Sequence, residues 1–297
     1  MAEFVEKDAA SWRRVVDFPL VALGIAVVLF IFAARLGDIA GSAIDLGSPN
    51  LNVVARNGVI FILVLQTYKV AIARLGSHPR DDLSGNRAVP MLGAGLLVGF
   101  VLMTASVGIA ALAHVYVLTG PGDSSQLEHA LITTAIMPAF MEEMLFRGIL
   151  FRWIEDLAGS WIALLLTSAL FGLVHILNPG ATWFTSLAIA VEAGILLGGA
   201  YMLTRSLWLP IGLHAAWNFT QGEIFDVPVS GLPEHGLVQA KLGGPAILSG
   251  GQFGLEASII CFVLATATGI WFVWAAVRGG HSVRPWWVRR RSVVLVH

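Results

Sequence analysis

Three hydrophobic stretches of this sequence contain polar side chains that could do chemistry, and each set repeats a spacing of four residues. The stretch MPAFMEEMLFRGIL, residues 137–150, contains Glu142, Glu143 and Arg147. The other two are LFGLVHILNPG, with Phe171 and His175, and SLWLPIGLHAAWNF, with His214 and Asn218. An ionisable side chain near the middle of a membrane costs at least about 2.5 kcal/mol, so each one is a functional candidate.

The first stretch contains an acid with a local partner and an acid without one. Glu143 and Arg147 are four residues apart, so they share a helix face and can form an ion pair. Glu142 is turned by about 100° and lacks that partner, which leaves its carboxylate available as a general base. Pro138 cannot donate to the carbonyl of Thr134, so a bend or local water is expected there. The alternative is a purely structural ion cluster between helices.

The imidazoles lie on two further helices. His175 precedes the helix-ending residues 178–180, and its alternative role is packing in the helix bundle. His214 and Asn218 can point at one spot, and Pro210 stands four residues before His214, as Pro138 stands before Glu142. A rise of about 1.5 Å per residue places Glu142, His175 and His214 within the middle third of a membrane. A further acid, Glu192, is either a partner for Arg or His or an additional carboxylate of the site.

The composition predicts the elements that position these groups. Of 297 residues, 57% are hydrophobic and 12% charged, against about 25% charged in soluble domains, and the mean hydropathy is +0.78. We therefore expect a multi-pass protein of the cell membrane. The net charge of -1 gives no reason to expect a nucleic-acid partner. The single cysteine, Cys261, excludes an intrachain disulfide and a metal cluster built on cysteines.

Eight apolar stretches are long enough to cross a membrane core of about 30 Å. The expected spans are 18–36, 53–74, 90–118, 129–153, 160–177, 183–203, 206–222 and 255–277. Lys and Arg favour the cytoplasmic side, and their distribution places both termini there. The fold class is thus all-α, a polytopic transmembrane helix bundle. We divide it into N-terminal helices (1–125), a core with the polar motifs (126–222), and an irregular Gly- and Pro-rich outer loop, last span and basic tail (223–297).

The motifs EExxxR (Glu142, Glu143, Arg147), FxxxH (Phe171, His175) and HxxxN (His214, Asn218), in this order on three hydrophobic helices, resemble those of the CPBP family of intramembrane proteases. That family includes the type II CAAX prenyl endopeptidases and bacterial proteins similar to lysostaphin resistance protein A. The resemblance covers about residues 130–222. The first three spans and the last have no family motif, and Glu192 lies outside the motifs.

The resemblance implies an intramembrane endopeptidase acting on a membrane-associated or lipidated protein or peptide. Glu142 and His175 would activate water, His214 and Asn218 would stabilise the oxyanion, and Arg147 would hold Glu143. Glu142, His175 and His214 could instead bind one divalent metal such as Zn, because the family is widely labelled metalloprotease. The sequence leaves that choice, prenyl recognition and the oligomeric state open. The rival functions are a proton- or ion-coupled transporter, with Glu142, Glu192 and His175 as a relay, and an inactive membrane scaffold.

Overall fold

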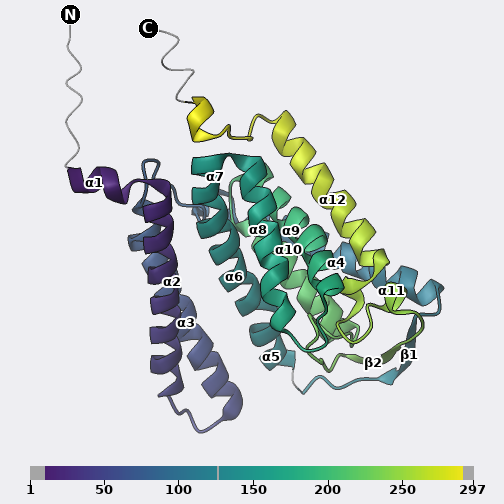
Figure 1. Ribbon diagram of the computed structural model, residues 1–297. Coiled ribbons are helices and arrows are strands. Elements are labelled where there is room, and N and C mark those ends of the chain that lie inside the picture. Colours follow the sequence, from purple (N-terminus) through teal and green to yellow (C-terminus); the bar gives the residue numbers. More distant parts are fainter. Residues whose placement is uncertain (1–10, 126, 290–297) are drawn as a thin grey trace, which may run out of the picture.

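The computed structural model describes residues 11–125 and 127–289, which form a bundle of long helices with a small sheet at one end (Figure 1). A short helix, α1 (Ser11–Val16), precedes two long helices, α2 (Pro19–Ser42) and α3 (Pro49–Val70), which pack against each other along one side of the bundle. The first and the last described helical turns lie at the same end of the bundle, which we call the termini end; the opposite end is the sheet end.

The remaining helices surround the polar motifs. Short turns η1 (Ile72–Arg74) and η2 (Gly85–Arg87) lead into α4 (Ala88–Leu112). One helical path then runs through α5 (Leu127–Ala130), η3 (Leu131–Ile136), α6 (Met137–Glu143), η4 (Met144–Phe151) and α7 (Arg152–Ala158). It is followed by α8 (Ser160–Val174), η5 (His175–Leu177), α9 (Trp183–Thr204), α10 (Trp208–Phe219), η6 (Thr220–Ile224), α11 (Ala246–Ser249), η7 (Leu255–Ala257) and α12 (Ile259–Arg278).

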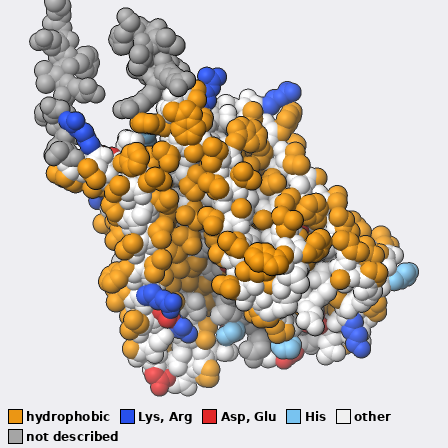
Figure 2. All heavy atoms as spheres, viewed as in Figure 1, with side chains coloured by type: hydrophobic (Ala, Val, Ile, Leu, Met, Phe, Trp, Pro, Cys, Tyr) orange, Lys and Arg blue, Asp and Glu red, His pale blue; other side chains and the backbone are white. Residues whose placement is uncertain are grey.

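The exterior suits a lipid environment. Six helices in the described part of the chain are long and apolar enough to cross a membrane: 19–42, 49–74, 85–112, 160–177, 183–204 and 259–278. Figure 2 shows hydrophobic side chains over most of the face in view, with charged side chains gathered towards its ends. The other two expected spans, 129–153 and 206–222, are also helical, and they are two of the three that contain the polar motifs. The all-α, multi-pass membrane fold is thus confirmed.

Small residues let the central helices approach closely. On α4, a methyl group at Gly95 would overlap the carbonyl oxygen of Leu209 on α10. Between α8 and α9, a methyl group at Gly172 would overlap the carbonyl oxygen of Ser186. Because lipid tails are as apolar as side chains, such backbone contact is a main source of helix association in membranes. These contacts fix α9 and α10, which contain Glu192 and His214, and α8, which leads directly into η5 and His175.

Several expected boundaries were wrong. The third span was expected to reach residue 118, but α4 ends at Leu112 and strand β1 (Tyr116–Pro121) follows. This strand pairs antiparallel with β2 (Val238–Leu242), inside the loop expected to be irregular. The last span begins at Ile259 and not at 255. Tyr116 and Val117 are residues that suit strands, and their apolar character was mistaken for the end of a helix.

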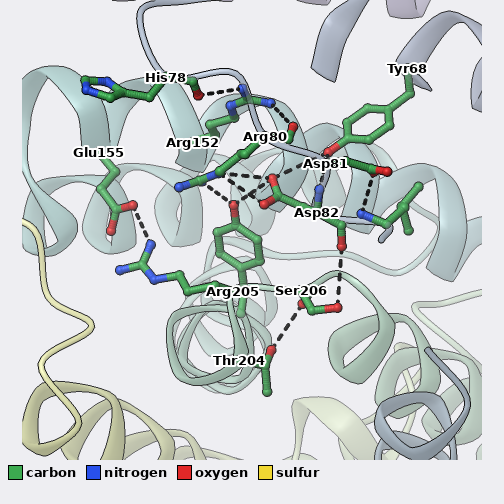
Figure 3. A network of polar contacts seen from close by, with 12 residues as sticks. Tyr68, His78, Arg80, Asp81, Asp82, Arg152, Glu155, Thr204, Arg205 and Ser206 are labelled. Carbon is green, nitrogen blue, oxygen red and sulfur yellow. Dashed lines mark hydrogen bonds and ion pairs between the residues drawn. The ribbon is translucent and has the colours of Figure 1, made fainter. Parts of the chain in front are cut away.

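A buried polar cluster ties the loop before α4 to the bundle at the termini end (Figure 3). The carboxylate of Asp82, 3% exposed, accepts hydrogen bonds from the hydroxyls of Tyr68 (3.4 Å) and Tyr201 (3.1 Å) and pairs with Nε of Arg80 at 3.1 Å. Burial raises the pKa of the Asp82 carboxyl, while Arg80 and Arg152 act to lower it. Arg152 donates to the carbonyl of Arg80 at 3.0 Å. The cluster therefore joins α3, α7 and α9, and it explains basic residues that the sequence assigned only to orientation.

Candidate functional site

The helix that contains the two glutamates departs from α geometry on both sides of them. The segments η3 and η4 are π-helical and flank α6, and π turns are frequent at functional sites. Pro138 lies in the first turn of α6, as expected from its missing N–H. The carbonyl of Thr134, which Pro138 cannot satisfy, accepts a hydrogen bond from Nδ2 of Asn218 at 3.0 Å. The predicted helix defect thus anchors the amide of a second helix and leaves that amide one further hydrogen to donate.

Glu143 is the centre of a buried ionic group. Its Oε1 atom accepts from Nη1 of Arg147 at 2.8 Å and lies 3.0 Å from Nδ1 of His214. The side chains of Glu143 and Arg147 are 0% and 1% exposed. The predicted ion pair is confirmed, and it extends across to α10.

This contact determines which form of His214 can donate to an oxyanion. Because Nδ1 donates to the Glu143 carboxylate, a neutral ring would have no hydrogen on Nε2. The Nε2 atom therefore donates only from the protonated ring, whose charge Glu143 balances. A donor to an oxyanion at Nε2 of His214 would therefore be the imidazolium form of the ring.

His175 lies where α8 gives way to η5, and its Nδ1 atom is 2.6 Å from the carbonyl oxygen of Phe171. A carbonyl only accepts, so Nδ1 carries the hydrogen and Nε2 of a neutral ring is a base. The ring of Phe171 packs against both imidazoles, with centroid distances of 4.7 Å to His175 and 6.2 Å to His214. The FxxxH spacing therefore supplies both the orientation of His175 and the packing between the two imidazoles.

His175, His214 and Asn218 line one cavity of about 40 Å³. Water needs about 10–15 Å³ measured in this way, so there is room for about three molecules. Glu192 lies on the same wall, without the Arg or His partner that one interpretation expected, and its Oε2 atom has no hydrogen-bond partner. The structure therefore places Glu192 at the cavity.

Glu142 lies beside this cavity and is not among the residues that line it. Its Oε2 atom is 4.0 Å from Nε2 of His214, and its side chain is 32% exposed. That distance is too long for a direct hydrogen bond, but one water molecule could contact both atoms. Of the four expected catalytic residues, Glu142 is the one that does not line the cavity.

Glu256 and Ser230 also line the cavity, and neither was predicted from the sequence. Glu256 lies in η7 and is 3% exposed. Its only signal was an acid in the otherwise apolar stretch GLEASII, and the wrong start of the last span concealed its position in the loop. Burial raises the pKa of Glu256 to about 7, against hydrogen bonds from Ser230 that act to lower it.

The suggested metal ligands Glu142, His175 and His214 do not fit a metal as they are arranged. Within residues 11–125 and 127–289, no group of three His, Cys, Asp or Glu side chains lies close enough to hold one ion. The Nδ1 contacts of His214 and His175 leave both Nε2 atoms open, so the separation of the three side chains, and not the orientation of the rings, is what does not fit a metal. We therefore derive no chemical step through a metal.

The fold and the site together define a multi-pass membrane protein with an acid, imidazole and amide site inside its helix bundle. Residues 125–220 match the family described as type II CAAX prenyl endopeptidase Rce1-like. The chain is also 27% identical over 171 residues to YdiL of Bacillus subtilis (strain 168), which is named a putative membrane peptidase. That match covers 54% of this chain and 64% of YdiL. No solved structure matches the chain. The resemblance to the CPBP family is thus confirmed, and it falls on the helices that contain the motifs.

Proposed function

We propose that the protein is an intramembrane endopeptidase that hydrolyses a peptide bond of a membrane-associated or lipidated protein or peptide. The supporting observation is that His175, His214 and Asn218, from η5 and α10, line one cavity with room for about three water molecules. Glu142 lies 4.0 Å from His214. The match to an endopeptidase family and the membrane peptidase name of YdiL also support the proposal.

In the proposed reaction, Glu142 and the free Nε2 of His175 activate a water molecule, which attacks the peptide carbonyl. Nε2 of His175 accepts a hydrogen bond from the water, and Glu142 takes its proton. The imidazolium of His214 and the second amide hydrogen of Asn218 donate to the oxyanion, because both donors are already held by Glu143 and Thr134. Arg147 pairs with Glu143 and holds it in place. The proton from water ends on Glu142, so the negative charge passes from Glu142 to the oxyanion. When the carbonyl forms again, the C–N bond breaks and Glu142 gives that proton to the departing amine nitrogen.

Glu142→Gln tests the proposal in proteoliposomes that contain a fluorogenic transmembrane peptide. We expect cleavage to fall at least about 100-fold, because the amide cannot accept a proton at neutral pH. Glu128→Gln is the matched control, since Glu128 is exposed and lies on α5 of the same helical path. Undiminished cleavage by Glu142→Gln would remove Glu142 from the mechanism.

The same preparation separates the rival functions. A transporter would show altered proton or ion flux in Glu142→Gln without cleavage in either protein, whereas a scaffold would show neither. The contribution of a metal is tested by elemental analysis of the purified protein and by activity after chelation. Stoichiometric Zn that is lost together with activity would overturn the metal-free assignment of Glu142 and His175.

A further inference from the structure

Two carboxylates on the cavity wall have no part in the proposed hydrolysis. Glu192 comes from the middle of α9 and Glu256 from η7, and their residues are 1% and 3% exposed. The Oε2 atom of Glu192 and the Oε1 atom of Glu256 are both buried without a hydrogen-bond partner. Both residues line the cavity that His175 and His214 also line. The catalytic cavity therefore contains acceptor atoms that nothing in the described chain satisfies.

The charges around the cavity favour a cationic ligand. No Lys or Arg side chain is among the residues that line the cavity, and Nδ1 of His214 already contacts Glu143 at 3.0 Å, so Glu143 would balance a charge on that ring. Two neighbouring buried carboxylates do not both ionise readily. The pair therefore retains one proton and has a net charge of about -1. A buried charge is costly unless it is paired. A single positive charge would balance the pair.

The size of the cavity selects the kind of cation. A cavity of about 40 Å³ has room for about three water-sized groups. The end of a lysine side chain, an ammonium with one or two methylenes, fits this space, and its three donors match the unpaired carboxylate oxygens. A guanidinium group is broader and planar, so it fits this cavity less well than an ammonium group.

We propose that Glu192 and Glu256 form a subsite for a primary ammonium group of the substrate, next to the scissile bond. This inference rests on the proposed function, because the same cavity contains His175, His214 and Asn218. The ammonium comes either from a lysine side chain or from a free α-amine. Substrates with such a group are therefore cleaved in preference to neutral ones.

The test compares reporter peptides that differ at one position. Lysine, its uncharged analogue norleucine, arginine or glutamate is placed in turn at each position flanking the scissile bond, with the N-terminus free or acetylated. We expect lysine to raise kcat/KM at least about tenfold over norleucine at one position. The effect of acetylation distinguishes the α-amine from the side chain. A ratio near one at every position, with free and acetylated termini alike, would overturn the inference.

Variants assign the preference to the two carboxylates. In Glu192→Gln and Glu256→Gln we expect the lysine-to-norleucine ratio to fall towards one, whereas Glu128→Gln keeps the ratio of the unmodified protein. If the variants fail to fold, inhibition of the unmodified protein by small molecules still tests the subsite. Propylammonium should competitively inhibit cleavage of the norleucine peptide, and propanol should not. A preserved ratio in both folded variants, or equal inhibition by the two compounds, would contradict the subsite.

Failure of the proposed function would give a different result. If the protein cleaved none of the peptides, the endopeptidase assignment would fail, and thermal unfolding would still test the subsite. Propylammonium should then raise the unfolding temperature of the unmodified protein and not that of Glu192→Gln. The absence of this difference would reject the subsite independently of any activity.

Discussion

The substitution Glu143→Gln tests the central electrostatic argument, because one carboxylate oxygen holds both Arg147 and His214. The amide is the same size but has no charge. It leaves Arg147, 1% exposed, without an ionic partner, and breaking a buried pair in this way costs about 3–5 kcal/mol. It also removes the charge that balances the imidazolium of His214. A neutral ring loses its Nε2 donor, and loss of one oxyanion donor lowers kcat about 100- to 1,000-fold.

A double variant separates the two effects. In Glu143→Gln with Arg147→Met, the unpaired buried charge is gone, so the free energy of unfolding should return to within about 2 kcal/mol of the unmodified protein. The activity should stay low, because His214 still lacks its counter-ion. Reversible unfolding in mixed micelles and cleavage in proteoliposomes measure the two quantities. If the double variant regained full activity, Glu143 would serve only the fold and the imidazolium argument would be refuted.

Two further predictions concern packing and pH. Gly95→Ala should destabilise the protein by about 1–3 kcal/mol or more through overlap with α10, whereas Gly93→Ala, with open space at that position, should change stability little; unfolding in micelles compares them. Burial, and next the charge of Glu234, raises the pKa of Glu223 to about 7. A raised pKa favours the protonated form in the folded state. The stability that Glu223 contributes should therefore be fully present below about pH 4.5, the usual pKa of a glutamate, and should be lost as the pH rises through 7. Melting curves from pH 5.5 to 8.5 should show this fall, and Glu223→Gln should flatten it.

The sequence predicted those parts of the structure that depend on local spacing and on the cost of burying charge. The eight helical stretches follow from apolar length, and the Glu143–Arg147 pair follows from a spacing of four residues. The released carbonyl of Thr134 follows from Pro138. Each of these depends on groups within one turn or one span, where helix geometry is fixed.

The remaining features depend on contacts between distant segments. Nothing local to His214 shows that Nδ1 faces Glu143, which lies 71 residues away in the chain, so the sequence could not indicate which form of the ring would donate from Nε2. Glu256 enters the cavity from a loop whose path has no periodic pattern. The pairing of β1 with β2 also joins two segments that lie before and after the core (126–222) in the chain. The catalytic roles themselves stay predictions until activity is measured.

The unequal bonding of the two adjacent glutamates has an evolutionary consequence. Glu143 contacts a cation and an imidazole at hydrogen-bond distance, whereas Oε2 of Glu142 has no hydrogen-bond partner in the described part of the chain and lies 4.0 Å from His214. A descendant that abandoned hydrolysis could therefore replace Glu142 at little cost to folding, while selection for a stable protein would preserve Glu143 and Arg147. In such a lineage, replacement of Glu142 alone would indicate that hydrolysis had been lost.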